Sequence, residues 1–230
     1  GGAINGYGQS KNNTFEGCSF TNNTAINDGG AIYYKGNIVS NIFENCSFIK
    51  NTAGNNGGAI GTYRSFISNE FNESQFIMNI ATVNGGALYS DGTFNNNVIE
   101  NTEFKNNTAA KNDGAVYIYS SSSDNLFENL IFSNNNAETK DGGAINFHGE
   151  TSETSFTNVT FFKNTAKNYG GAINTDQDLN KENEYVDVDF INNKASNGGA
   201  MGGYGQSNTN SFEGCLFANN SATNNGGAVC

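Results

Sequence analysis

His148 and Asp176 are the two residues of this sequence whose types could support acid–base chemistry together. His148 is the only histidine of the chain, and Asp176 follows it at an interval of 28 residues. An imidazole beside a carboxylate can move protons, and carboxylates that act with a second acid–base group cleave polysaccharides. The reactivity of this pair depends on what a 28-residue interval means for the fold.

An interval of 28 residues is the period of the whole chain. The motif Gly-Gly-Ala recurs with this spacing, apart from a single step of 29 residues, and only Asp113 breaks its double glycine. The alanines of the motif are Ala3, Ala31, Ala59, Ala87, Ala115, Ala144, Ala172, Ala200 and Ala228. These positions divide the chain into eight units (1–28, 29–56, 57–84, 85–112, 113–141, 142–169, 170–197 and 198–225) and a stub, 226–230. We interpret the chain as one segment of a longer repeat array.

A second motif, Phe-x-x-Asn, recurs in phase with the first in every unit. Its phenylalanines are Phe20, Phe48, Phe76, Phe104, Phe132, Phe161, Phe190 and Phe217. Its asparagines are Asn23, Asn51, Asn79, Asn107, Asn135, Asn164, Asn193 and Asn220. Helical repeats and propeller blades have longer periods, roughly 33 residues or more, and the leucine pattern of a horseshoe is missing. Each unit alternates short apolar runs with Asn, Gly and Ser, which is typical of strands and turns.

These features predict an all-β fold, a parallel β-solenoid with one three-stranded coil per repeat. In the second unit the strands are expected near Ala31 to Lys35, Val39 to Phe43 and Cys46 to Lys50. Equivalent residues of successive coils stack at about 4.8 Å, the spacing of paired strands. The phenylalanines should then form core columns. The asparagines should form columns of amides that bond the coils above and below, because a stacked amide both donates and accepts.

The paired motifs resemble the repeat of the chlamydial polymorphic outer membrane proteins. They are also similar to repeats of adhesin-like proteins from some methanogenic archaea. The resemblance covers essentially the whole chain and rests on Gly-Gly-Ala-(Ile/Leu/Val) together with Phe-x-x-Asn. It implies a right-handed, single-stranded parallel β-helix that is extracellular, exposed at the cell surface, and active in adhesion.

Tyrosines gather on the predicted outward face of the first strand, at positions 5 and 7 of the units. They are Tyr7, Tyr33, Tyr63, Tyr89, Tyr117, Tyr119 and Tyr204. Tyrosine combines an apolar ring with a polar tip and is favoured at recognition surfaces. This face is a candidate binding site for a glycan or a protein of another cell or surface, although β-propensity alone also accounts for exposed tyrosines.

Position 7 also contains His148 and Asp176, in adjacent coils and about 5 Å apart on the expected spacing. We expect an exposed pair without a catalytic role, because a regular repeat does not form an active-site pocket. The acidic patch of Asp176, Asp178, Asp187 and Asp189 lacks the glycine-rich repeat that would indicate a calcium site. We therefore predict no catalytic residues, no metal and no cofactor.

Cys18 and Cys46 occupy the same position in adjacent coils, within the distance that a disulfide spans. An extracellular setting would allow the bond, whereas two identical inward positions disfavour its torsions, so both states stay open.

The formal net charge of −11, with 11 lysine and arginine residues, excludes a large basic surface. Nucleic acid and direct membrane insertion are therefore not expected. The function predicted from the sequence is a non-enzymatic surface adhesin, a stiff stalk that attaches to cells, glycans or surfaces. The alternatives are a filament or sheath subunit that self-associates end to end, and a polysaccharide-active enzyme.

Overall fold

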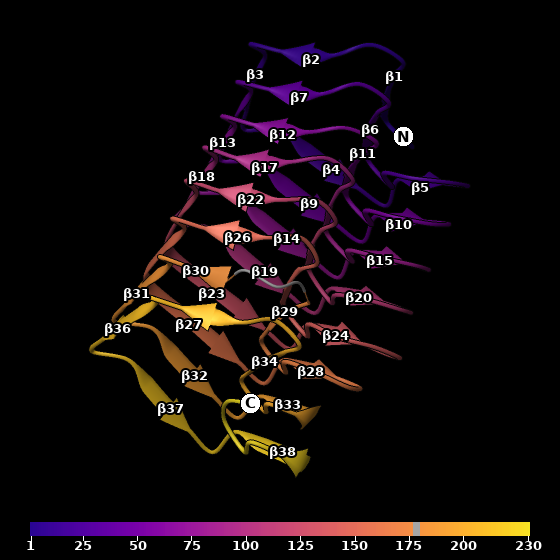
Figure 1. Ribbon diagram of the computed structural model, residues 1–230. Helices are drawn as coiled ribbons and strands as arrows, with labels where there is room; N and C mark the ends of the chain where they lie inside the picture. Colours follow the sequence, from indigo (N-terminus) through magenta and orange to yellow (C-terminus); the bar gives the residue numbers. More distant parts are fainter. Residues whose placement is uncertain (177–179) are drawn as a thin grey trace.

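The computed structural model, which describes residues 1–176 and 180–230, is a parallel β-solenoid (Figure 1). The chain winds through about eight coils, and the described residues contain strands but no helix. Strand residues pair with their equivalents in the next coil, as Ile32 does with Ile60. The predicted fold class, an all-β solenoid with a 28-residue period, is confirmed.

Each coil contributes to four sheets, all of whose strands pair in parallel. The first sheet consists of β1 (Ile4–Gly6), β6 (Ile32–Tyr34), β11 (Ile60–Thr62), β16 (Leu88–Ser90), β21 (Val116–Ile118), β25 (Ile145–Phe147), β29 (Ile173–Thr175) and β34 (Met201–Gly203). The second sheet consists of β2 (Ser10–Lys11), β7 (Ile38–Val39), β12 (Phe66–Ile67), β17 (Phe94–Asn95), β22 (Ser122–Ser123), β26 (Thr151–Ser152), β30 (Asn180–Lys181) and β35 (Ser207–Asn208).

The third sheet is the largest, because most coils contribute two strands to it. Its strands are β3 (Thr14–Glu16), β4 (Ser19–Thr21), β8 (Ile42–Glu44), β9 (Ser47–Ile49), β13 (Glu70–Asn72), β14 (Gln75–Ile77), β18 (Val98–Glu100), β19 (Glu103–Lys105), β23 (Leu126–Ser133), β27 (Ser155–Phe162), β31 (Glu184–Val186), β32 (Asp189–Ile191), β36 (Ser211–Glu213) and β37 (Leu216–Ala218). In β23 and β27 the two strands of a coil merge into one.

The fourth sheet extends to one side of the solenoid (Figure 1). It consists of β5 (Thr24–Ala25), β10 (Thr52–Ala53), β15 (Ile80–Ala81), β20 (Thr108–Ala109), β24 (Asn136–Ala137), β28 (Thr165–Ala166), β33 (Lys194–Asn197) and β38 (Ser221–Asn225). A typical coil therefore contains five short strands, whereas the sequence predicted three. The strand expected over Val39 to Phe43 is split in two, because Ser40 adopts a positive φ of 52° and turns the chain.

Phenylalanine rings stack along the interior of the solenoid. The rings of Phe48 and Phe76 are nearly parallel, with an interplanar angle of 3° and centroids 4.7 Å apart. Phe43 and Phe71 form part of a second column, in which the centroids lie 4.5 Å apart. Rings of neighbouring columns meet edge to face, as Phe71 and Phe76 do. The core thus repeats one set of aromatic contacts in successive coils.

Buried amides connect successive coils at two corners. In the Phe-x-x-Asn column, Asn51 Nδ2 donates to Asn79 Oδ1 in the next coil at 3.0 Å and to Phe20 O in the preceding coil at 2.8 Å. A parallel column runs through Asn41, Asn69, Asn97 and Asn125. Since each amide bonds both neighbouring coils, the corners bury polar groups that have hydrogen-bond partners.

Candidate binding face on the first sheet

The residues at position 7 form a row at the ends of the strands of the first sheet. From the second to the seventh coil their backbone amides donate to the preceding coil, for example Tyr119 N to Ser90 O at 2.9 Å and His148 N to Ile118 O at 2.9 Å. The row consists of Tyr7, Lys35, Tyr63, Asp91, Tyr119, His148, Asp176 and Tyr204. These bonds fix the row along the solenoid axis, so it presents its side chains from a rigid platform.

The tyrosines of the predicted binding face fall into two groups. Tyr7, Tyr63, Tyr119 and Tyr204 of position 7 are exposed, with 50% or more of each residue accessible. Tyr89 and Tyr117 of position 5 are only 8% and 4% accessible. The prediction that these two belong to an exposed face is therefore wrong. Tyr33, also at position 5, is partly buried, and burial together with nearby carboxylates raises its pKa to about 12.

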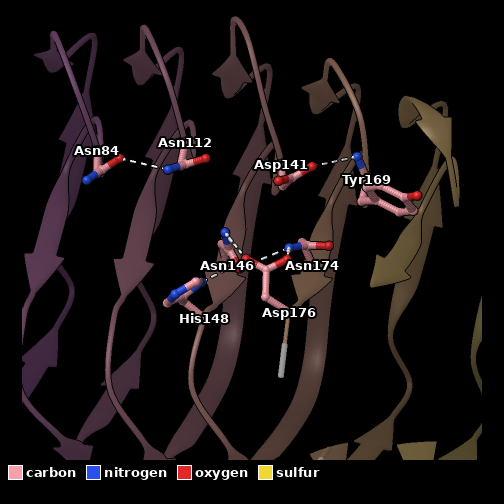
Figure 2. Close-up of polar contacts among 8 residues, drawn as sticks. All are labelled: Asn84, Asn112, Asp141, Asn146, His148, Tyr169, Asn174 and Asp176. Atoms are coloured by element: carbon pink, nitrogen blue, oxygen red, sulfur yellow. Dashed lines mark hydrogen bonds and ion pairs between the residues drawn. The ribbon is translucent and has the colours of Figure 1, made fainter. Parts of the chain in front are cut away.

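The Gly-Gly corner explains why position 5 is buried although it points away from the core. The corner turns back over the outer face of the first sheet, so that a Cβ atom added to Gly85 would lie 3.4 Å from Cβ of Tyr89. The residue before each corner lies in a second row beside the sheet (Figure 2). In this row Asn112 Nδ2 donates to Asn84 Oδ1 at 2.9 Å.

His148 and Asp176 meet as their spacing indicated. His148 Nδ1 and Asp176 Oδ2 are 3.0 Å apart, and Asn174 Nδ2 donates to Asp176 Oδ1 at 2.6 Å (Figure 2). Asn146 Nδ2 lies 3.5 Å from Asp176 Oδ2. Both carboxylate oxygens thus have partners, and the Tyr119 ring stacks on the imidazole with centroids 4.9 Å apart. This arrangement orients the imidazole and the ring of Tyr119.

A hollow of about 380 Å³ adjoins this cluster and is lined by Tyr119, Ser120, Ser121, His148, Gly149 and Glu150. Its aromatic wall and polar rim suit a ligand with both apolar and hydroxyl-bearing surfaces. Among the residues that the structure describes, no three His, Cys, Asp or Glu side chains converge as metal ligands would. Asp178 of the predicted acidic patch lies outside the described residues.

Asp113 interrupts the double glycine of the repeat, and the sequence alone gives no role for it. It replaces the first glycine of a corner, adopts a φ of +66° and is completely buried. Neither of its carboxyl oxygens has a hydrogen-bond partner. Burial, followed by the charge of Asp176, raises its pKa well above the ordinary value. In the sequence, this buried carboxyl is marked by the departure from the Gly-Gly-Ala motif.

The two columns predicted from the Phe-x-x-Asn motif can be followed in the structure. Among the Phe-x-x-Asn phenylalanines, Phe48, Phe76, Phe104, Phe132, Phe161 and Phe190 are fully buried, whereas Phe20 and Phe217 belong to the terminal coils and are less covered. The asparagines Asn23, Asn51, Asn79, Asn107, Asn135, Asn164 and Asn193 each donate to the next asparagine of the column, which ends at Asn220.

All four cysteines of the chain lie in the described part and are free thiols, so no disulfide joins Cys18 to Cys46. Instead, Cys46 Sγ donates to Phe15 O of the preceding coil at 3.3 Å. Burial raises the pKa of the Cys46 thiol, which keeps it protonated.

The described part of the chain contains no helix that could cross a bilayer. A comparison with curated proteins and one with solved structures gave no match. In contrast, the model of the Chlamydia polymorphic membrane protein repeat matches residues 17–35, 45–63, 129–147, 158–176 and 214–230. Each matched segment contains one Phe-x-x-Asn and the Gly-Gly-Ala that follows it. The resemblance noted in the sequence is thereby confirmed: five segments of this parallel β-solenoid match the polymorphic membrane protein repeat.

Proposed function

We propose that this chain is a non-enzymatic segment of a cell-surface adhesin, in which a stiff solenoid presents the position-7 row to glycans or proteins of another surface. The repeat family suggests a surface-associated β-helix protein and is not known for enzymatic activity. The observation that carries the proposal is the set of exposed rings on this row, including Tyr63 and Tyr119, held on a hydrogen-bonded backbone. Aromatic side chains on a fixed backbone have few rotatable bonds to order, so they bind with little loss of conformational entropy.

The proposal is tested by attachment of the purified segment to cells and to a glycan array. The double substitution Tyr63→Ser and Tyr119→Ser should lower attachment at least tenfold, because exposed aromatic anchors carry much of the energy of recognition. The matched control is Ile80→Ser with Ile131→Ser, which removes comparably exposed apolar side chains, 46% and 48% accessible, from other sheets. Equal attachment of the tyrosine variant and the wild type would refute this binding face.

A second candidate function is a filament or sheath subunit. The amide columns are directional, because Asn193 Nδ2 donates to Asn220 Oδ1 of the next coil and not the reverse. A further coil, whether from the same chain or a second copy, could therefore bond in the same sense. Electron microscopy of the native cell surface separates the candidates, since single stalks favour the adhesin and ordered fibres favour the filament.

A further inference from the structure

A second hollow on the same face has a different chemical character. It measures about 600 Å³ and is lined by Tyr7, Lys35, Gly36, Tyr63, Arg64 and Asp91. Arg64 is the single arginine of a chain whose formal net charge is −11. Two cations and two aromatic rings therefore meet at one place on an otherwise acidic protein.

The cations of this hollow have no acidic partner. The ion pairs found among the described residues are Lys105–Glu103 and His148–Asp176, and they include neither Lys35 nor Arg64. Both side chains are exposed. Asp91 lies in the same hollow, but its Oδ1 accepts a hydrogen bond from Tyr89 Oη at 3.0 Å. An unpaired guanidinium offers a planar set of donors that matches a carboxylate or a sulfate.

Hydrogen bonds fix the backbone from which the two cationic side chains extend. Lys35 N donates to Gly6 O at 2.8 Å, while Arg64 N donates to Thr62 Oγ1 at 3.1 Å. Arg64 O accepts from Gly92 N of the next coil at 3.1 Å. The floor of the hollow is thus formed by hydrogen-bonded coils, and the exposed side chains of Lys35 and Arg64 extend from it.

We propose that this hollow binds an anionic sugar residue, one that bears a carboxylate or a sulfate, within a largely neutral glycan. Lys35 and Arg64 bind the anion, and Tyr63 packs against the apolar face of the sugar ring. Asp91 Oδ2 accepts a hydrogen bond from a sugar hydroxyl. A polyanion is disfavoured, because the net negative charge of the protein repels it at longer range. The inference rests on the proposed adhesive function and specifies the ligand chemistry of its binding face.

The test is calorimetric titration of the whole 230-residue chain. The probes are a trisaccharide with one uronate residue, the methyl ester of that trisaccharide, and a trisaccharide with one sulfate ester. At least one anionic probe should bind about tenfold more tightly than the methyl ester, because the ester removes a charge-assisted hydrogen bond. The anionic probe that binds more tightly shows whether the hollow prefers a carboxylate or a sulfate.

Two variants assign the binding to this hollow. Arg64→Gln and Lys35→Gln should each weaken the anionic probe at least fivefold and leave the methyl ester unchanged. The matched control Lys105→Gln removes a cation from the third sheet and should have no effect. Melting temperatures equal to that of the wild type show that the variants fold.

The proposal is overturned if no probe binds at millimolar concentration, if acid and ester bind equally, or if Arg64→Gln binds as the wild type does. Equal affinity for a triglutamate peptide would also overturn it, since the hollow would then recognise charge without a sugar. Attachment to cells without binding of an anionic probe refutes this inference and leaves the adhesive function standing. Binding of an anionic probe without attachment to any cell refutes the adhesive function and leaves the binding of an anionic sugar at this hollow standing.

Discussion

At the scale of single residues, the buried amide of Asn135 hydrogen-bonds to both neighbouring coils. Its Nδ2 donates to Phe104 O and Asn164 Oδ1, and its Oδ1 accepts from the backbone and side chain of Asn107. Asn135→Ala would leave buried groups on two neighbouring coils without partners, which costs about 3 kcal/mol of the free energy of unfolding. Chemical denaturation would measure this loss.

The adjacent Asn136 provides a matched control for this prediction. It is partly exposed and occupies a column in which Thr24, Thr52, Thr108 and Thr165 stand in other coils. Asn136→Thr should change the free energy of unfolding by less than about 0.5 kcal/mol, as surface substitutions usually do. Similar losses in the two variants would show that the amide column does not stabilise the fold.

Asp113 is predicted to destabilise the protein in a pH-dependent way. Because its pKa is raised in the folded state by burial, the folded protein binds more protons than the unfolded chain above pH 3.8, the ordinary value. The contribution of Asp113 to stability therefore falls as the pH rises from about 4. Asp113→Gly should stabilise by about 1 kcal/mol near pH 4, where relief of the positive φ dominates, and by more at pH 7.

Thermal unfolding of the two proteins across this pH range measures the difference. A constant gain at all pH values would show that only backbone strain is relieved, and a loss of stability in the glycine variant would contradict the prediction. Attachment measured alongside shows whether the binding face requires the carboxyl group, since strained and unpartnered buried residues concentrate at functional sites.

The positions of single residues could be predicted from the sequence where they follow from the repeat. The repeat period and the strand spacing predicted that Phe48 and Asn51 stack on their equivalents in the next coil. They also predicted that His148 and Asp176 are neighbours, because register follows directly from the period. Alternation assigned Tyr117 to the outward side of its strand, but outward proved not to mean exposed. The burial of Tyr117 depends on a corner that folds over the sheet, and no pattern within a single strand encodes this.

At the scale of the elements, the two glycines of each corner have different tasks. Gly57 adopts a φ of +65°, whereas Gly58 is required by space, because a Cβ atom there would lie 2.0 Å from Gly86 O of the next coil. Gly58→Ala should therefore cost about 3 kcal/mol or more in the free energy of unfolding, since the obstacle is backbone that many hydrogen bonds hold in place.

Gly8→Ala serves as the control for the corner. A Cβ atom at Gly8 meets no atom within 4 Å, and its φ is not left-handed. Its substitution should alter the midpoint of denaturation by little or nothing. If Gly58→Ala is equally mild, the coils can separate locally, and the close approach at the corner is not needed for folding.

The sequence predicted the presence of strands better than their boundaries. The apolar runs gave the first strand correctly, but the corners at Ser40 and at similar positions interrupt strands without Gly or Pro to mark them. Ser68 and Asp124 also have positive φ values at equivalent corners. Hydrogen bonds from the neighbouring coils impose these turns, as when Ser40 N donates to Ile67 O. The turns are therefore a tertiary effect that local propensity does not reveal.

At the scale of the whole molecule, the repeat separates stability from recognition. The motif residues occupy the core and corners, while position 7 varies among aromatic, basic and acidic side chains. Its members differ from coil to coil, as Lys35, Tyr63 and Asp91 do, without disturbing the register of the strands that they follow. On the proposed function, variation at this row would change the ligand without changing the fold.

Because each coil contacts chiefly its neighbours, removing one whole period should leave a folded protein. Deletion of residues 57–84 joins Asn56 to Gly85 and places Phe48 next to Phe104 and Asn51 next to Asn107, which restores both motif columns. We expect a β-rich far-ultraviolet circular dichroism spectrum, cooperative unfolding and a lower free energy of unfolding. Deletion of residues 57–70 is the control, since it removes half a period, including β11 and β12, and leaves a coil that lacks strands of the first two sheets. A folded control of equal stability would show that the period does not determine the register, whereas a disordered 28-residue deletion would show that the coils are not independent units.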